Sequence, residues 1–249
     1  MLHTLIKKLA PVAAMAMAFG TAGCNGVDIK INDTEGVPLA ELDMSGDPPT
    51  EVVLAGPDSV IISDGETLDI QVEGDDEAVE ALRFSLEDGT LGIHREKDSW
   101  DNNGTATVRV TMPAPRELVI AGSGSLEAAS LAGTSSVTIA GSGDAKTDNV
   151  TADKLEVTVA GAGTYSASGT TGSLELTIAG SGSAKMAGLK SDASEVTIAG
   201  SGDAEFASDG DVEANIVGSG SVTVTGEATC TVNSIGSGRV KCKTVREDD

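Results

Sequence analysis

Apolar residues recur at fixed places through the second half of this 249-residue chain, with a period of 18 to 20 residues. Each period contains two short runs in which apolar and polar residues alternate, joined by a triplet of glycine, a small residue and glycine. Alternation with a period of two predicts β-strands that bury one face. The seven triplets begin at Gly122, Gly141, Gly161, Gly180, Gly200, Gly218 and Gly236. A constant period near 20 predicts a solenoid in which each repeat forms one coil.

Alignment on the first glycine of each triplet sorts the strand residues into columns. Four columns are almost wholly apolar and are expected to point inward, namely those two and four residues before the glycine and four and six residues after it. In chain order they are Ile120, Ile139, Val159, Ile178, Ile198, Ile216 and Ser234; Leu118, Val137, Val157, Leu176, Val196, Ala214 and Val232; Leu126, Ala145, Tyr165, Ala184, Ala204, Val222 and Val240; and Ala128, Thr147, Ala167, Met186, Phe206, Val224 and Cys242. The triplet is then a corner whose glycines require positive φ or very close stacking. The second corner varies in length, which explains the drift of the period.

Two further columns are expected to point outward. One is rich in threonine, and the other, five residues before the glycine, contains Glu156, Glu175, Glu195 and Glu213 in consecutive coils. Stacked strands would hold these carboxylates about 5 Å apart, where like charges repel. Three interpretations are open: a solvated acidic face, a weak divalent-cation site, or a surface that meets a basic partner.

Residues 51–113 contain shorter alternating runs, including one on each side of a turn at Asp88-Gly89. These runs predict strands that form the first coils or a cap. Parallel connections between strands are nearly always right-handed. The predicted fold is therefore an all-β, right-handed parallel β-helix over residues 114–243, with a charged tail at 244–249.

The first 23 residues have the pattern of a signal peptide, since Lys7 and Lys8 precede an apolar run too short to span a bilayer. Thr21-Ala22-Gly23-Cys24 resembles a bacterial lipobox, in which the cysteine is acylated after cleavage in front of it. Cleavage of an ordinary signal peptide nearby is the alternative. The next residue is Asn25 and not aspartate, which in the lipoproteins that this segment resembles indicates the outer membrane. The expected product is an exported, outer-membrane lipoprotein facing the periplasm or the surface, with residues 24–50 as a flexible acidic tether.

Composition restricts the partners and the core. The chain has 16 Lys+Arg against 39 Asp+Glu, a net charge of -23, which argues against nucleic acid. Aromatic residues make up only 2%, so small and β-branched side chains must fill the interior. Two cysteines remain besides Cys24, and export would permit a disulfide between Cys230 and Cys242. Two separate buried thiols are equally compatible with the sequence.

No motif indicates catalysis or a cofactor. Outside the signal peptide His94 is the single histidine, so neither a Ser/His/Asp triad nor a zinc site can be assembled. Asp144 and Asp203 lie three coils apart, or roughly 14 Å, too far to act together. The glycine triplets are not phosphate loops, because no helix follows them. We expect no catalytic residues and no cofactor; a polysaccharide-active β-helix enzyme is the alternative, and would need converging carboxylates.

The segment Asp88-Gly89-Thr90-Leu91-Gly92-Ile93, the strand at residues 107–113, and Leu118-Val119-Ile120-Ala121-Gly122-Ser123-Gly124 with its repeats resemble the head GIN domain of auto-transporter adhesins. The resemblance covers about residues 51–243. It implies a β-helix found in secreted and lipid-anchored bacterial proteins, and a role in adhesion or in binding a protein or glycan partner. The family has no established catalytic residues, so none is transferred. A structural envelope lipoprotein is the other non-catalytic interpretation.

Overall fold

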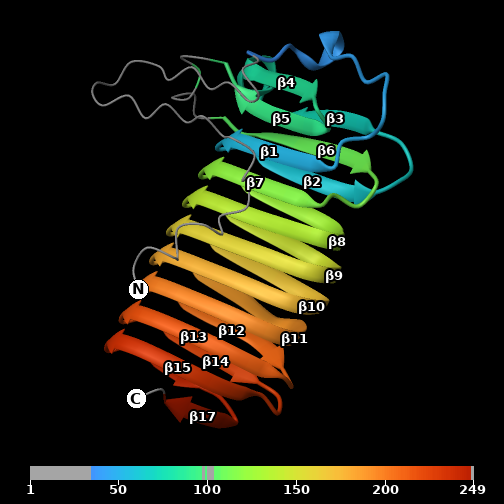
Figure 1. The fold of residues 1–249 in the computed structure, drawn as a ribbon. Coiled ribbons are helices and arrows are strands. Elements are labelled where there is room, and N and C mark those ends of the chain that lie inside the picture. The colour runs from blue at the N-terminus through green and yellow to red at the C-terminus, as the bar shows by residue number, and fades with distance from the viewer. Residues whose placement is uncertain (1–34, 97–98, 100–103, 248–249) are drawn as a thin grey trace.

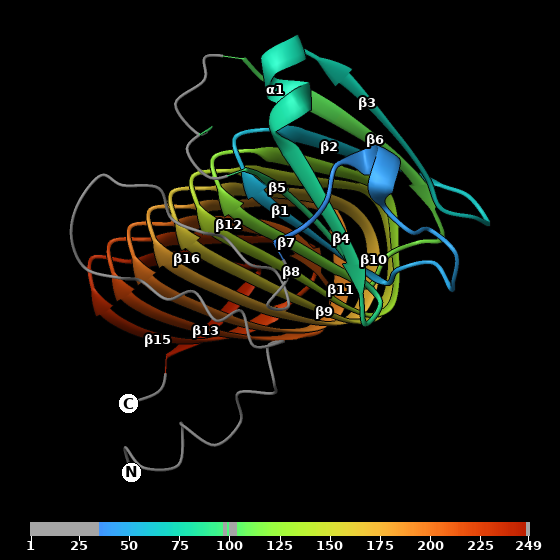
Figure 2. The same cartoon turned by 90° about the horizontal axis from the view of Figure 1, so that it is seen from above.

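The computed structural model describes residues 35–96, 99 and 104–247 (Figure 1). Their strands form one continuous sheet that winds into a parallel β-solenoid of about seven coils. Seen from above, the coils stack closely around an elongated interior (Figure 2). The predicted all-β solenoid with coils of about 19 residues is confirmed.

The elements fall into two groups. Before the repeats lie the 3-10 helix η2 (Leu39–Glu41), β1 (Glu51–Gly56), β2 (Ser59–Asp64), β3 (Asp69–Gly74), α1 (Asp76–Ala81), β4 (Leu82–Glu87), β5 (Thr90–Arg95), β6 (Ala106–Met112) and β7 (Glu117–Gly122). The repeats contain β8 (Ser125–Gly141), β9 (Asp144–Gly161), β10 (Thr164–Gly180), β11 (Ser183–Gly200), β12 (Asp203–Ser208), β13 (Asp211–Gly218), β14 (Ser221–Thr225), β15 (Thr229–Gly236), β16 (Arg239–Lys241) and β17 (Thr244–Glu247).

The middle coils differ from the expected pattern of two strands per coil. Each of β8, β9, β10 and β11 runs unbroken from one triplet to the next, through the second corner. Register shifts at that corner absorb the variation in length, for example between Gly133 and Thr134 and between Met186 and Lys190. Among the repeats that follow β8, two separate strands per coil appear only from β12 onward.

The four predicted inward columns form the core in every coil except the last, where Ser234 is exposed and Val232, Val240 and Cys242 are half-buried. Tyr165 is completely buried, its hydroxyl lies 3.2 Å from Thr147 Oγ1, and burial raises its pKa to about 12. A fifth buried column lies six residues before the glycine and contains Ser135, Leu155, Leu174, Ser194, Val212 and Cys230. Its serines hid this column from the hydrophobic pattern.

The glycines of each triplet are required for two different reasons. The first has φ between +124° and +133° in all seven copies. Its carbonyl accepts a hydrogen bond of 2.8–2.9 Å from the middle residue of the next triplet. The third glycine has no room for a side chain, because atoms of the earlier coils lie too close. A Cβ on Gly202 would lie 2.5 Å from Ile178 Cγ2 and 2.7 Å from the carbonyl of Gly182. Positive φ at the first glycine and close stacking at the third, the two reasons suggested by the sequence, therefore both apply at the same corner.

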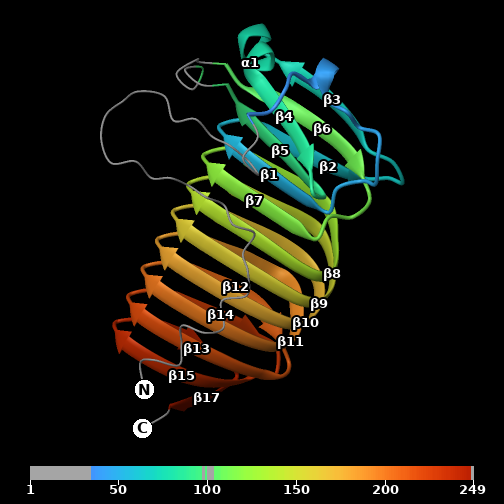
Figure 3. The same ribbon diagram turned by 45° about the horizontal axis from the view of Figure 1, so that its top comes forward.

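The N-terminal strands add one coil and a cap. β1 lies parallel to β7 with Gly56 opposite Gly122, and β2 lies parallel to β8. β5 stacks on β1 and β6 on β2, again in parallel. The antiparallel strands β4 and β3 then complete this end beside α1 (Figure 3).

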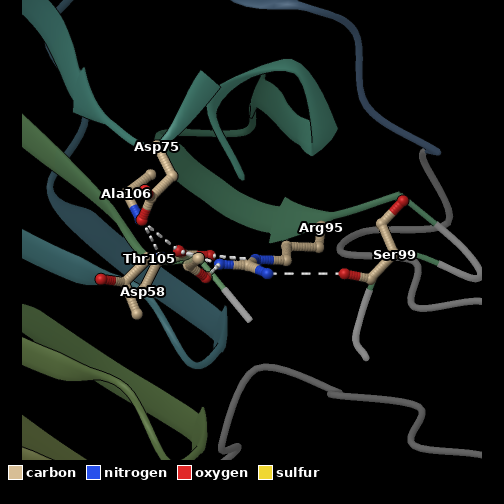
Figure 4. Close-up of polar contacts among 7 residues, drawn as sticks. Asp58, Asp75, Arg95, Ser99, Thr105 and Ala106 are labelled. Atoms are coloured by element: carbon tan, nitrogen blue, oxygen red, sulfur yellow. Dashed lines mark hydrogen bonds and ion pairs between the residues drawn. The ribbon is translucent and has the colours of Figure 1, made fainter. Parts of the chain in front are cut away.

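A buried ion pair joins the cap to the first coil (Figure 4). Asp58 stands two residues after Gly56, in the place of a third glycine. Arg95 donates to both Asp58 oxygens, from Nε at 2.8 Å and Nη2 at 2.6 Å, and the carboxylate also accepts the Ala106 backbone N–H at 2.8 Å. Both side chains are 1% exposed or less, and the contact raises the pKa of Arg95. The coil of β1 and β2, which has no complete glycine triplet, is thus joined to the cap by side chains.

Part of the segment expected to be a flexible tether, residues 24–50, contacts the cap. Val37 exchanges two backbone hydrogen bonds of 2.8 Å with Phe84, and Leu39 and Leu42 pack against the core. His94 Nε2 lies 3.0 Å from the carbonyl of Glu35, and burial lowers the pKa of this histidine. Apolar contacts to the cap therefore begin well before residue 50. Cys24 and the expected signal peptide lie outside the described residues.

A disulfide joins Cys230 to Cys242, with Cα atoms 6.3 Å apart. The sequence left this pairing open. Cys230 is buried at the start of β15, and Cys242 follows β16, so the bond closes the last coil. That coil has a neighbour on one side along most of its length and buries little core of its own. The covalent link therefore compensates for weak packing at this end.

We expect Gly200→Ala to destabilise the protein by about 3 kcal/mol or more, because a side chain at φ +133° is strained and its Cβ would lie 2.2 Å from the Gly180 carbonyl. Urea denaturation followed by circular dichroism measures the change. Ser201→Ala, at the neighbouring exposed position, is the matched control and should change stability by about 0.5 kcal/mol or less. Equal effects of the two substitutions would contradict the explanation.

Replacing both Cys230 and Cys242 with alanine should cost about 3 kcal/mol, the loop-closure entropy of a bridge this short. Because each coil contacts only its neighbours, the loss should be confined to the end of the rod. Hydrogen exchange should accelerate in β15 and β17 and stay unchanged in β8 to β11. Reduction of the wild-type protein should reproduce the pattern, and a uniform increase along the rod would refute it.

Candidate functional site

The most regular surface is the one formed by the outward residues of the strand segment that precedes each triplet. We call it the Glu–Thr–Ala wall, after the residue types five, three and one positions before the first glycine. Its columns are Glu117, Ser136, Glu156, Glu175, Glu195 and Glu213; Val119, Thr138, Thr158, Thr177, Thr197 and Asn215; and Ala121, Ala140, Ala160, Ala179, Ala199 and Val217. Parallel pairing without a shift keeps these positions in register from β7 to β13. The wall therefore repeats the same chemistry at the strand spacing, about 4.8 Å.

The glutamate column is longer than the four candidate residues. Glu51 lies opposite Glu117 in the added first coil, and Ser136 separates this pair from Glu156, Glu175, Glu195 and Glu213. The sequence missed Glu51, although the β1 sequence Glu-Val-Val-Leu-Ala-Gly is nearly that of β7, Glu-Leu-Val-Ile-Ala-Gly. Burial and the charge of Glu51 raise the pKa of Glu117.

Lys154 neutralises part of the column. Its Nζ lies 2.8 Å from a Glu175 oxygen and 3.6 Å from a Glu156 oxygen. A shallow depression beside these residues is lined by Lys154, Glu175, Glu195, Asp211 and Glu213. Because successive glutamates stand on successive strands, they form a row and do not converge. Across the described chain, no group of three or more His, Cys, Asp or Glu side chains could hold a metal ion. The glutamate row therefore contains no cluster of ligands for the weak divalent-cation site that the sequence suggested.

The candidate catalytic residues are dispersed. Asp203 accepts a hydrogen bond from Ser221 in the adjacent coil, and Asp144 lies opposite Thr164 on β9 and β10. His94 is buried in the cap against Glu35. What the wall offers chemically is a series of carboxylates, hydroxyls and methyl groups, which can bind but do not form a nucleophile–base pair.

The surface on the other side of the triplet corner is ion-paired and irregular. Lys146 contacts Glu127 at 2.5 Å and Asp148 at 2.8 Å, and these partners raise the pKa of Lys146. Lys190 contacts Asp209 at 2.5 Å at the second corner. Exposed pairs of this kind contribute little stability. They satisfy the charges locally, whereas the Glu–Thr–Ala wall leaves a repeated pattern open to a ligand.

Comparisons with known proteins identify a family and structures with the same fold. The family model described as "Putative auto-transporter adhesin, head GIN domain" matches residues 48–228. No curated protein sequence matches the chain. Within the described residues, no helix has the length and apolar character needed to cross a membrane.

Solved structures share the fold at low sequence identity. A "putative adhesin" from Bacteroides fragilis is 20% identical with a TM-score of 0.67, over 78% of this chain and 93% of that one. A "putative adhesin" from Parabacteroides merdae is 18% identical with a TM-score of 0.59, over 82% and 93%. A "putative lipid binding protein" from Parabacteroides distasonis is 20% identical with a TM-score of 0.54, over 82% and 94%. These likenesses establish the architecture alone.

Glu117→Gln should stabilise the protein at pH 7 by about 1 kcal/mol, the size of one like-charge contact. The raised pKa of Glu117 means that folding favours the protonated form of this carboxyl. The protonated form therefore contributes to stability at low pH, and this contribution is lost as the pH rises through the folded pKa. The gain from glutamine should therefore disappear in acid, below the pKa of the unfolded chain. Thermal unfolding between pH 3 and 8 measures it.

Glu127→Gln is the control for this prediction, because Glu127 is paired with Lys146. It should give no gain at any pH. A gain for Glu117→Gln that persists unchanged at pH 3 would contradict the electrostatic explanation.

Proposed function

This chain belongs to the head GIN domain family of adhesins, and from that premise we propose that it is a non-catalytic binding module of the bacterial cell envelope. The observation that carries the proposal is the Glu–Thr–Ala wall. A surface that repeats along the rod suits a ligand that also repeats, such as a glycan polymer or a basic protein surface. Two of the similar structures carry the name "putative adhesin", which supports the same role.

The wall is suited to binding because little order is lost when it is covered. Its threonines and alanines have few rotatable bonds, and its backbone is fixed by pairing on both sides. Preorganisation of this kind lowers the entropic cost of association. Threonine hydroxyls and glutamate oxygens can hydrogen-bond to sugar hydroxyls or to cationic side chains, while alanine permits close approach.

Export and lipidation at Cys24 complete the proposal. A lipid on Cys24 would attach the chain to the membrane through its N-terminus. The cap lies at that end of the rod and the last coil at the other (Figure 1). An outer-membrane lipoprotein would then hold the wall away from the lipid surface, on the periplasmic or the outer side.

The test is binding of the purified chain to a glycan array and to isolated envelope fractions. Thr158→Arg combined with Thr177→Arg places bulky charges at the centre of the wall and should weaken binding at least tenfold. The control variant also carries two arginines, but across the triplet corner, in Ser166→Arg with Thr223→Arg, and should bind within about twofold of wild type. Absence of binding to every fraction, or equal loss in both variants, would reject the proposal.

A further inference from the structure

The C-terminal end of the rod is an open sheet edge. β17 covers β15 only from Thr229 to Val232, and within the described chain no strand pairs with the outer edge of residues 233–236 or of β16. In every earlier coil the first and third glycine carbonyls of the triplet accept N–H groups from the following coil. Gly236 and Gly238 are followed by no such coil. This edge therefore offers backbone groups arranged to continue a parallel sheet.

The wall changes chemistry at the same end. The threonine column ends in Asn215 and Asn233, whose amides are hydrogen-bonded at 3.0 Å. The alanine column ends in Val217 and Ile235, 54% and 74% exposed. With Met44 these are the large apolar side chains most exposed in the described residues. We call Asn215, Val217, Asn233 and Ile235 the terminal patch.

Charge distinguishes this end from the rest of the rod. Between Lys190 and Arg239 the sequence has eight acidic residues and no Lys or Arg. Arg239, Lys241 and Lys243 then follow within five positions. Lys243 is paired with Glu227 at 3.1 Å, while Arg239 and Lys241 are exposed on the edge strand, without an ion-pair partner in the described part of the molecule. An edge with unpaired cations is complementary to an acidic occupant.

We propose that this end docks an extended acidic segment of a partner protein, which adds as a strand along β15 and β16. Backbone hydrogen bonds to the free edge would supply affinity, and apolar side chains of the segment would cover the terminal patch. Acidic side chains would pair with Arg239 and Lys241. These contacts select a peptide with alternating apolar and acidic residues.

A second copy of this chain is a poorer occupant of the same edge. A symmetric pairing of two C-terminal ends would bring Arg239 and Lys241 close to their counterparts, and like charges at an edge oppose self-association. The other end of a copy is a poor match as well, because its outermost strands β3 and β4 run antiparallel to the strands of the coils. Charge complementarity therefore favours a partner of different sequence.

This inference is separate from binding by the Glu–Thr–Ala wall and can fail without it. Thr158 and Thr177 lie on β9 and β10, several coils from the edge of β15 and β16, so the Thr158→Arg and Thr177→Arg variant should leave peptide docking unchanged. Conversely, substitutions at Arg239 and Lys241 should leave binding to envelope fractions by the wall unchanged.

The probe is a fluorescent peptide with the sequence of residues 197–206, Thr-Ile-Ala-Gly-Ser-Gly-Asp-Ala-Glu-Phe, because the strand registers give Asp203 and Glu205 the same places in their coil as Arg239 and Lys241. Fluorescence polarisation should show saturable binding that weakens as salt is raised. A peptide of the same composition in scrambled order, and one with lysine in place of both acids, should bind at least tenfold more weakly.

Two variants of the protein locate the site. Arg239→Glu with Lys241→Glu should reduce peptide affinity at least tenfold, and so should Ile235→Asp, which alters an exposed side chain. Lys185→Glu is the matched control, since Lys185 has the same place within its coil as Lys241 but lies on β11, between paired strands. It should bind within about twofold of wild type.

Three results would overturn the proposal. They are no saturable binding of the peptide of residues 197–206, equal affinity in the Lys241 and Lys185 variants, and a concentration-dependent wild-type dimer that Arg239→Glu with Lys241→Glu abolishes. The last, measured by sedimentation, would make the occupant a second copy.

Discussion

The hydrogen bonds between successive glycine corners are the constraint on which this structure depends. Each first-glycine carbonyl accepts an N–H from the triplet of the next coil, and the positive φ of that glycine turns the chain within one residue. No side chain fits at either glycine, since a Cβ would meet the backbone of the coil before it. Because the corner cannot vary in length, every strand that leaves it begins in the same register.

Constant register converts a repeated sequence into straight columns. Inward columns of small and β-branched residues fill a narrow core, and Tyr165 and Phe206 are accommodated beside alanines. Outward columns create the Glu–Thr–Ala wall, where like carboxylates are stacked at some electrostatic cost. The second corner has no such constraint, so its insertions appear as register shifts that leave the wall unaffected.

A solenoid of this kind must terminate its sheet at both ends, and this chain does so differently at each. At the N-terminal end, antiparallel strands and the buried Asp58–Arg95 pair close the stack. At the C-terminal end, a disulfide and a short strand hold the last coil but leave an edge exposed. The asymmetry leaves one end of the rod protected and the other available for contact.

The sequence by itself determined the coil, its four inward columns and the glutamate row, because local alternation and a fixed glycine interval specify strand faces and corners. It predicted strands in residues 51–113 as first coils or a cap, but it did not identify β1 and β2 as the added coil, since residues 65–116 separate them from the repeats along the chain. The ion pair of Arg95 with Asp58 and the contacts of residues 35–50 with the cap could not be predicted from the sequence. Both depend on which strands the cap brings together. Only the tertiary structure decided how the rod ends, since an edge is open or covered according to long-range pairing that no local pattern encodes.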